Sequence, residues 1–146
     1  MERLTDILFY ALEKSIKSYR QFAQQSINQH GFDITIDQWL VLKAIHANPD
    51  WTQQQIAEAT FKDYASVTRM IDLLVKKQYL KRDLREDDRR RFILTLTKPA
   101  ITLLEVLQPV IENNREIALK NIGSKEALEV HAILNTIISN CNLKKD

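Results

Sequence analysis

The segment from Thr52 to Thr97 places the strongest constraint on how this chain can fold. Its sequence is TQQQIAEATFKDYASVTRMIDLLVKKQYLKRDLREDDRRRFILTLT. Two helical patterns separated by a short turn come first, and two strand patterns separated by a charged run follow. This order predicts a winged helix-turn-helix. A helix near Tyr64–Gln78 could then lie in a DNA groove, with an arginine-rich loop beside it.

Local signals within this segment predict where its helices begin. Thr52 can cap a short helix together with Gln55, and Asp63 can cap the next helix after a turn at Phe61 and Lys62. In that next helix, apolar residues at spacings of four and three should be buried: Val67, Ile71 and Leu74. The open face is left with polar side chains: Tyr64, Ser66, Thr68, Arg69 and Asp72.

Two short strands are predicted after the helices, at Tyr79–Arg82 and Phe92–Leu96. The loop between them, residues 84–91, reads LREDDRRR and is too charged to pack in a core. Its arginines would suit a narrow and strongly negative minor groove, and its acids could orient them. The alternative is a solubilising hairpin tip, whose exposed ion pairs stabilise little.

Helical patterns fill the rest of the chain. One long amphipathic helix is predicted over 3–28, and a second over 33–48, capped by Thr35 with Gln38. A long helical section should follow Thr97, kink at Pro109 and end at Gly123, and a last helix should run to about Asn142. We expect one domain over 1–146, mainly α with a small β-hairpin. Its winged-helix lobe should span about 33–97, and its dimerisation helices about 3–30 and 98–142.

Charge is distributed unevenly along the chain. The net charge of the 146 residues is only +2, yet residues 61–98 contain eleven Lys or Arg and six Asp or Glu. A local basic excess in a near-neutral protein fits a surface that binds a polyanion, and it also fits a solvated hairpin. Charge alone leaves both interpretations open.

A helix that reads DNA needs short polar and basic groups on one face, because base edges in the major groove carry donors and acceptors. Ser66, Thr68 and Arg69 meet this need, with Tyr64 near the helix start. The free amides of the helix N-terminus should favour a phosphate. An ordinary amphipathic helix with a wet outer face is the alternative.

The segments IAEATFKDYASVTRMIDLLVKKQYLKRD and DRRRFILTLT resemble the MarR (multiple-antibiotic-resistance regulator) family of bacterial transcription factors. The run Asp88-Arg89-Arg90 before Leu96-Thr97 is its most specific part. The resemblance covers roughly 33–107 by motif. It implies a homodimer that interlocks its first and last helices and binds pseudo-palindromic operators. It also implies that Arg90 enters the minor groove and Asp88 braces the loop.

Two positions depart from the family pattern. Phe61 in the helix-helix turn and Gln78 after the second helix stand where the family often has glycine. If the backbone there is left-handed, a side chain costs about 1 kcal/mol or somewhat more.

We therefore expect a homodimeric repressor of double-stranded DNA, relieved by a small aromatic or anionic effector. The expected DNA contacts are Lys62, Tyr64, Ser66, Thr68, Arg69, Arg89, Arg90 and Arg91. The resemblance implies effector binding between the dimer helices and the lobe, and the candidate residues there, which could equally be core, are Tyr10, Tyr19 and Trp39. A winged-helix module that binds protein instead of DNA is the alternative function.

Other activities lack a signal in the sequence. There is no glycine-rich phosphate loop, no nucleophile with an evident base and no paired metal-ligand spacing, so we expect no enzyme, metal or cofactor. The one cysteine, Cys141, forms no intrachain disulfide and should be a small buried or interfacial residue; an oxidant sensor is the alternative. No signal peptide or apolar run of about 18 residues is present, so a cytoplasmic protein is expected.

Overall fold

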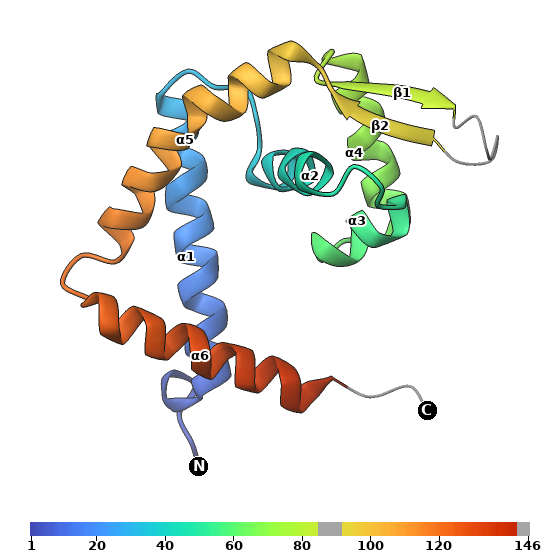
Figure 1. The fold of residues 1–146 in the computed structure, drawn as a ribbon. Coiled ribbons are helices and arrows are strands. Elements are labelled where there is room, and N and C mark those ends of the chain that lie inside the picture. The colour runs from blue at the N-terminus through green and yellow to red at the C-terminus, as the bar shows by residue number, and fades with distance from the viewer. Residues whose placement is uncertain (85–91, 143–146) are drawn as a thin grey trace. The chain divides into compact units, whose positions relative to one another are not determined.

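The computed structural model describes residues 1–84 and 92–142, and residues 85–91 and 143–146 lie outside this description. Over the described residues, a 3-10 turn, six α-helices and one hairpin follow one another (Figure 1). Their bounds are η1 Leu4–Asp6, α1 Leu8–Gln29, α2 Ile36–Ala47, α3 Gln53–Ala59, α4 Tyr64–Lys76, β1 Leu80–Leu84, β2 Phe92–Leu96, α5 Lys98–Ala118 and α6 Ser124–Cys141. The predicted mainly helical fold in winged helix-turn-helix order is confirmed. The chain separates into two compact units, 1–111 and 112–146, which are described separately below.

α2 lies at the centre of the first unit and packs against α1, α3, α4 and β2 (Figure 1). Val41 and Leu42 of α2 are completely buried. The core built around them also takes residues from outside the expected 33–97 lobe, from Ile27 of α1 to Leu107 and Ile111 of α5. The first half of α5 is therefore part of the lobe's core.

The predicted helix caps are confirmed by their hydrogen bonds, but the second helix starts at Ile36 and not at residue 33 as predicted. Thr35 and Gln38 form a reciprocal capping box at α2, and Thr52 and Gln55 form another at α3. At α4, the Asp63 carboxylate accepts a hydrogen bond of 2.7 Å from the backbone amide of Ser66. Each cap satisfies a backbone donor that the helix itself leaves without a partner.

α1, α3 and α4 end in the same left-handed turn. The left-handed residues are Gly31 at φ +83°, Phe61 at φ +60° and Gln78 at φ +65°. After α3, the Lys62 amide donates to the Ala57 carbonyl at 3.0 Å, and the Phe61 amide donates to Glu58 at 3.3 Å. This is the Schellman pattern, which strongly favours glycine at the left-handed position. Phe61 and Gln78 thus keep the left-handed backbone and add a side chain to it.

The hairpin pairs β1 and β2 antiparallel, with Leu80 opposite Leu96 and Leu84 opposite Phe92. Leu80 and Leu96 are buried, and the pair at the far end is exposed. The predicted bounds of the first strand, Tyr79–Arg82, are wrong at both ends. Residue 79 belongs to the turn after α4, and pairing with β2 extends the strand through residue 84.

Two other predicted boundaries are wrong. The helix expected over 3–28 is broken at Ile7, whose backbone is extended, and an Arg3–Asp6 ion pair closes the short turn before it. The helix expected to reach Gly123 ends at Ala118 instead. A left-handed Asn121 turns the chain before that glycine, which caps the start of α6. α5 continues through Pro109 without ending there, and the kink expected at that residue stays a prediction.

The second unit contains the end of α5 and α6, and no residue of α6 is buried in this chain. Several large apolar side chains of α6 are exposed, including Leu128, Ile133 and Ile138. Cys141 is exposed too, so the expectation that it is buried is wrong for this chain, and an interfacial position stays a prediction. Within 1–84 and 92–142, no helix is long and apolar enough to span a bilayer.

Replacing Phe61 or Gln78 with glycine should raise the free energy of unfolding by roughly 0.5–1 kcal/mol. The strain energy that glycine removes from the folded turn should exceed the conformational entropy that glycine adds to the unfolded chain. Equilibrium urea unfolding measures the change. The control is Ala59→Gly in α3, which should lower stability by about 1 kcal/mol because its backbone is helical. A loss of stability in all three variants would contradict the strain at these turns.

Candidate nucleic-acid interface

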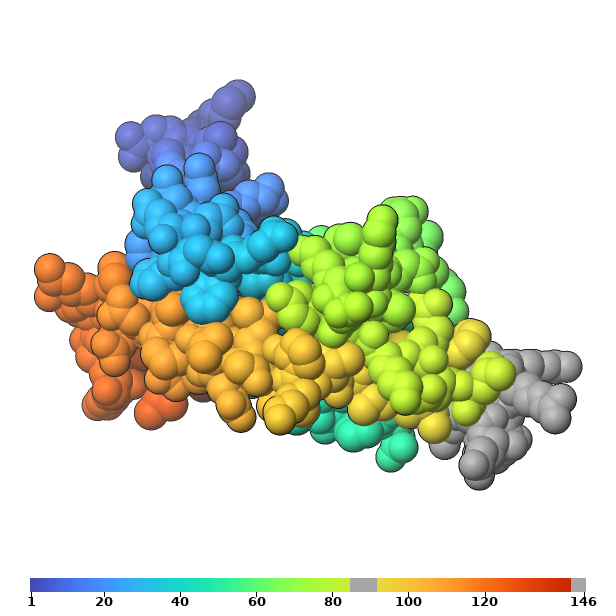
Figure 2. Space-filling view, turned by 90° about the horizontal axis from the view of Figure 1, so that it is seen from above, coloured from blue at the N-terminus to red at the C-terminus, as the bar shows by residue number. Residues whose placement is uncertain are grey.

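α4 separates its polar and apolar side chains as predicted. Val67, Ile71 and Leu74 are completely buried. The other face carries the exposed side chains of Tyr64, Arg69 and Asp72 and the half-buried side chains of Ser66 and Thr68. α4 and the hairpin beside it form one continuous surface in the space-filling view (Figure 2). All the side chains proposed on α4 for DNA contact therefore lie on one face.

A chain of hydrogen bonds runs along the start of that face. The Ser66 hydroxyl donates to Asp63 at 3.0 Å, and the Arg69 guanidinium donates to the same hydroxyl at 3.3 Å. The hydrogen bonds from the Ser66 amide and hydroxyl hold the pKa of the Asp63 carboxyl below its usual value of 3.8. The Ser66 amide is thus occupied by a carboxylate. A phosphate at this helix end, expected from free amides, would have to compete with it.

Thr68 is joined to α3 by a residue that the sequence did not single out. The side-chain amide nitrogen of Gln53 donates to the Thr68 hydroxyl. That hydroxyl in turn donates to the Tyr64 backbone carbonyl at 2.9 Å. Gln53 therefore belongs to the same polar face. Its partner is 15 residues away in the sequence, and no local spacing marks such a pair.

The hairpin is fastened to α4 by Arg82 of β1, another residue that sequence reasoning missed. Its guanidinium lies 2.6 Å from the Asp72 carboxylate and 5.4 Å from the centre of the Phe92 ring. A hollow of about 280 Å³ lies beside this contact. It is lined by Pro49, Asp50, Trp51, Thr52, Gln53, Gln54, Tyr64, Arg82, Phe92, Ile93 and Leu94. The effector candidates Tyr10, Tyr19 and Trp39 do not line this hollow.

Those three aromatic residues are half-buried within the first unit. Trp39 packs against the core, and Lys43 lies 6.0 Å from the centre of its ring. The Trp39 indole nitrogen is buried and has no hydrogen-bond partner among the described residues. A buried donor without a partner is costly, so a ligand acceptor there would be favoured.

Lys62, expected at the DNA, takes part in an ion-pair cluster in this structure. Its ammonium lies 3.0 Å from one Asp37 carboxylate oxygen, and Arg20 of α1 donates to the other. Burial raises the pKa of Asp37, but the hydrogen bonds and charges of Lys62 and Arg20 outweigh it and lower the pKa below 3.8. Whether Lys62 also contacts DNA stays a prediction.

The wing residues proposed from the sequence, Asp88, Arg89, Arg90 and Arg91, lie outside the described residues, and their roles stay predictions. Within the residues that the structure describes, no cluster of three or more His, Cys, Asp or Glu could hold a metal ion.

Comparison with known proteins supports the resemblance seen in the sequence. Residues 32–91 match the sequence model of the MarR family. This part of the chain is therefore similar to the MarR family. The segment that carried the resemblance, from the helix-turn-helix into the hairpin, overlaps the matched residues, so that prediction is confirmed.

Three known proteins are similar to this chain. A segment of 74 residues is 38% identical to the uncharacterised HTH-type transcriptional regulator YhbI of Bacillus subtilis, and covers 51% of this chain and 48% of that protein. The chain thus spans about half the length of this relative. BpsR of Bordetella bronchiseptica has a similar structure, with a TM-score of 0.86, 21% identity and coverage of 97% and 99%. A mutant of MarR from E. coli, solved with operator DNA, has a TM-score of 0.82, 21% identity and coverage of 94% and 99%. Both structures share the fold of this chain.

The Asp37 ion pairs predict a pH-dependent contribution to stability. Asp37→Asn should lower the free energy of unfolding by about 1 kcal/mol at neutral pH. Because the folded pKa is lowered, this contribution is present above the unfolded pKa and disappears as the pH falls through the folded one. The difference between wild type and variant should therefore shrink below about pH 4 in urea unfolding. Glu13→Gln, which removes an exposed pair within α1, is the control, and a pH-independent difference for Asp37→Asn would contradict the assignment.

Proposed function

We propose that this chain is a MarR-family transcriptional regulator that binds DNA, and that it acts as a homodimeric repressor of a pseudo-palindromic operator. One observation carries this proposal: the exposed polar face of α4, with Arg69 at its centre, lies opposite a completely buried face and beside the hairpin. A helix with such a face fits the major groove. The basic excess over residues 61–98 suits the phosphate backbone.

The named relatives support the same function. One MarR-family neighbour was solved with operator DNA, and the relative from Bacillus subtilis is named a transcriptional regulator. The interaction-module alternative has no comparable support. Regulators of this kind act by binding DNA, so we expect no enzymatic activity. We also expect the chain to work in the cytoplasm, where its DNA lies.

Each proposed contact has a distinct role. Arg69 would take a guanine edge or a phosphate, while Tyr64, Ser66 and Thr68 would approach the groove from the start of α4. Within the loop that joins the strands, Arg90 would enter the minor groove, and Asp88 would brace the loop. The two remaining arginines of this loop, Arg89 and Arg91, would contact phosphates.

A second copy of the chain would cover the exposed apolar residues near both ends. Leu8, Phe9 and Ile16 of α1 are more than half exposed, as are Leu128 and Ile133 of α6. Large apolar side chains left exposed on a helix often mark an interaction site. Two-fold pairing would give two α4 helices for two DNA half-sites about one turn apart.

An effector would bind near Tyr10, Tyr19 and Trp39 and relieve repression. The partnerless Trp39 indole nitrogen supports a ligand with an acceptor group there. The DNA binding of BpsR is regulated by 6-hydroxynicotinic acid, which is a small aromatic acid. A compound of that class is the first to test here.

Arg69→Ala and Arg90→Ala should each weaken operator binding about tenfold or more, without unfolding the dimer. Each variant removes a charged group that would otherwise meet the DNA. Titration of labelled operator measures the affinity, and thermal unfolding checks the fold. Arg115→Ala removes an exposed arginine of α5 outside the lobe and should change nothing. Full affinity in both lobe variants would contradict the proposed contacts.

Selection of bound fragments from random DNA should recover one site made of two inverted half-sites. The reason is that paired recognition helices related by a two-fold axis read the same bases twice. Sequencing of the enriched pool shows the symmetry directly. No enrichment over several rounds would favour the protein-interaction alternative.

A further inference from the structure

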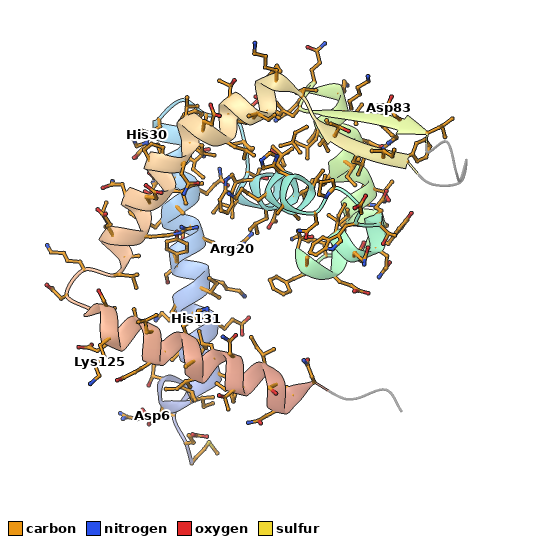
Figure 3. All side chains as sticks on the ribbon, viewed as in Figure 1. Asp6, Arg20, His30, Asp83, Lys125 and His131 are labelled. Carbon is orange, nitrogen blue, oxygen red and sulfur yellow. The ribbon has the colours of Figure 1, made fainter. Side chains whose placement is uncertain are left out.

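Three elements meet at one carboxylate, that of Asp37 in the first turn of α2. Arg20, partway along α1 (Figure 3), donates to one oxygen. Lys62, in the turn before α4, lies 3.0 Å from the other oxygen. The three side chains are only 26–38% exposed. The carboxylate therefore links α1 to the helix-turn-helix turn through the start of α2.

α1 has a second polar attachment to the start of α2, through Gln24. The Gln24 amide nitrogen donates to the Ile34 carbonyl at 3.0 Å, and its oxygen accepts from the Ile36 amide at 2.9 Å. Lys62, in contrast, makes its one ion pair within the described residues with Asp37. Loss of the Asp37 charge would therefore leave α1 attached to α2 through Gln24. It would remove the ion pair that joins Lys62, in the turn before α4, to α2.

The turn that Lys62 belongs to is strained. Phe61 is left-handed, and the residue is 91% exposed, so packing does not compensate for its backbone conformation. Strained residues persist where the surrounding structure holds them. The backbone bonds of the turn and the Lys62–Asp37 ion pair are the contacts that do so here. Because Asp63 caps α4 directly after Lys62, the turn sets where α4 begins.

We infer that Asp37 is a positioning residue for DNA recognition, and that Lys62 acts on α4 through Asp37 instead of contacting a phosphate. This inference rests on the proposed DNA-binding function. A lysine held 3.0 Å from a carboxylate has much of its charge compensated already, so it gains little from a phosphate. Its contribution lies in holding the turn that leads into α4.

Hydrogen exchange tests the positioning role without DNA. In Asp37→Asn, the amides of residues 61–66 should exchange roughly tenfold faster, because the turn opens locally. The amides of the buried α2 segment 41–45 should keep their protection. Glu13→Gln, which breaks an ion pair inside one helix, should change neither segment. If Asp37→Asn does not fold, Lys62→Met gives the same test with the Arg20–Asp37 pair intact. Unchanged exchange in 61–66 would overturn the inference.

The salt dependence of operator binding separates positioning from phosphate contact. Lys62→Met and Asp37→Asn should each weaken binding about tenfold while the slope of log affinity against log salt stays the same. Loss of a phosphate contact would instead lower that slope by roughly one per subunit. Such a drop for Lys62→Met would overturn the inference. If wild type binds no DNA at all, the proposed function fails, and the exchange result still decides the role of Asp37.

Discussion

The first unit depends on the burial of α2. Val41 and Leu42 are completely buried and Ile45 is 3% exposed, because α1, α3, α4 and β2 all pack around this helix. A helix with apolar residues on several sides is stable only when other elements pack against all of those sides. The helix-turn-helix pair and the hairpin are thus attached to one common element, and a change of volume at Val41 would be transmitted to all of them.

The polar face of α4 is ordered before any ligand arrives. Arg69 bonds to Ser66, which bonds to Asp63, and Thr68 is held between Gln53 and the Tyr64 carbonyl. Ordering a long side chain on binding costs about 0.5–1.5 kcal/mol, and part of that cost is met here during folding. The Arg69 bond is long and exposed, so the arginine can still exchange Ser66 for a stronger acceptor.

The sequence was informative wherever both partners of an interaction lie within one turn of helix. Both capping boxes, the Asp63 cap and the burial of Val67 could be predicted, because they depend on spacings of three and four. The interactions that place the elements relative to one another could not. Lys62 and Asp37 are 25 residues apart, and the sequence around a surface lysine does not indicate which residue it pairs with.

The predicted end of α5 was wrong for a related reason. Gly123 is a strong local breaker, yet α5 ends five residues earlier at Ala118, and Asn121 supplies the left-handed turn. Asparagine tolerates that conformation through local hydrogen bonding, so the two residue types compete to end the helix. For the candidate site, the residue types on α4 were predictable, whereas Gln53 and Arg82 emerge only once α3 and β1 pack against it.

At each end of α4, a left-handed residue lies next to a lysine that contacts the start of α2 or the residues just before it. Before α4, Phe61 is left-handed and Lys62 pairs with Asp37; after it, Gln78 is left-handed and Lys77 donates to the Asp33 carbonyl at 3.2 Å. Glycine at either position would remove the strain, but it would also open many other backbone conformations to the turn. A side chain there leaves fewer alternatives. We therefore expect the orientation of α4 against α2 to be more narrowly defined than it would be with glycine, at a cost in stability of roughly 0.5–1 kcal/mol per turn.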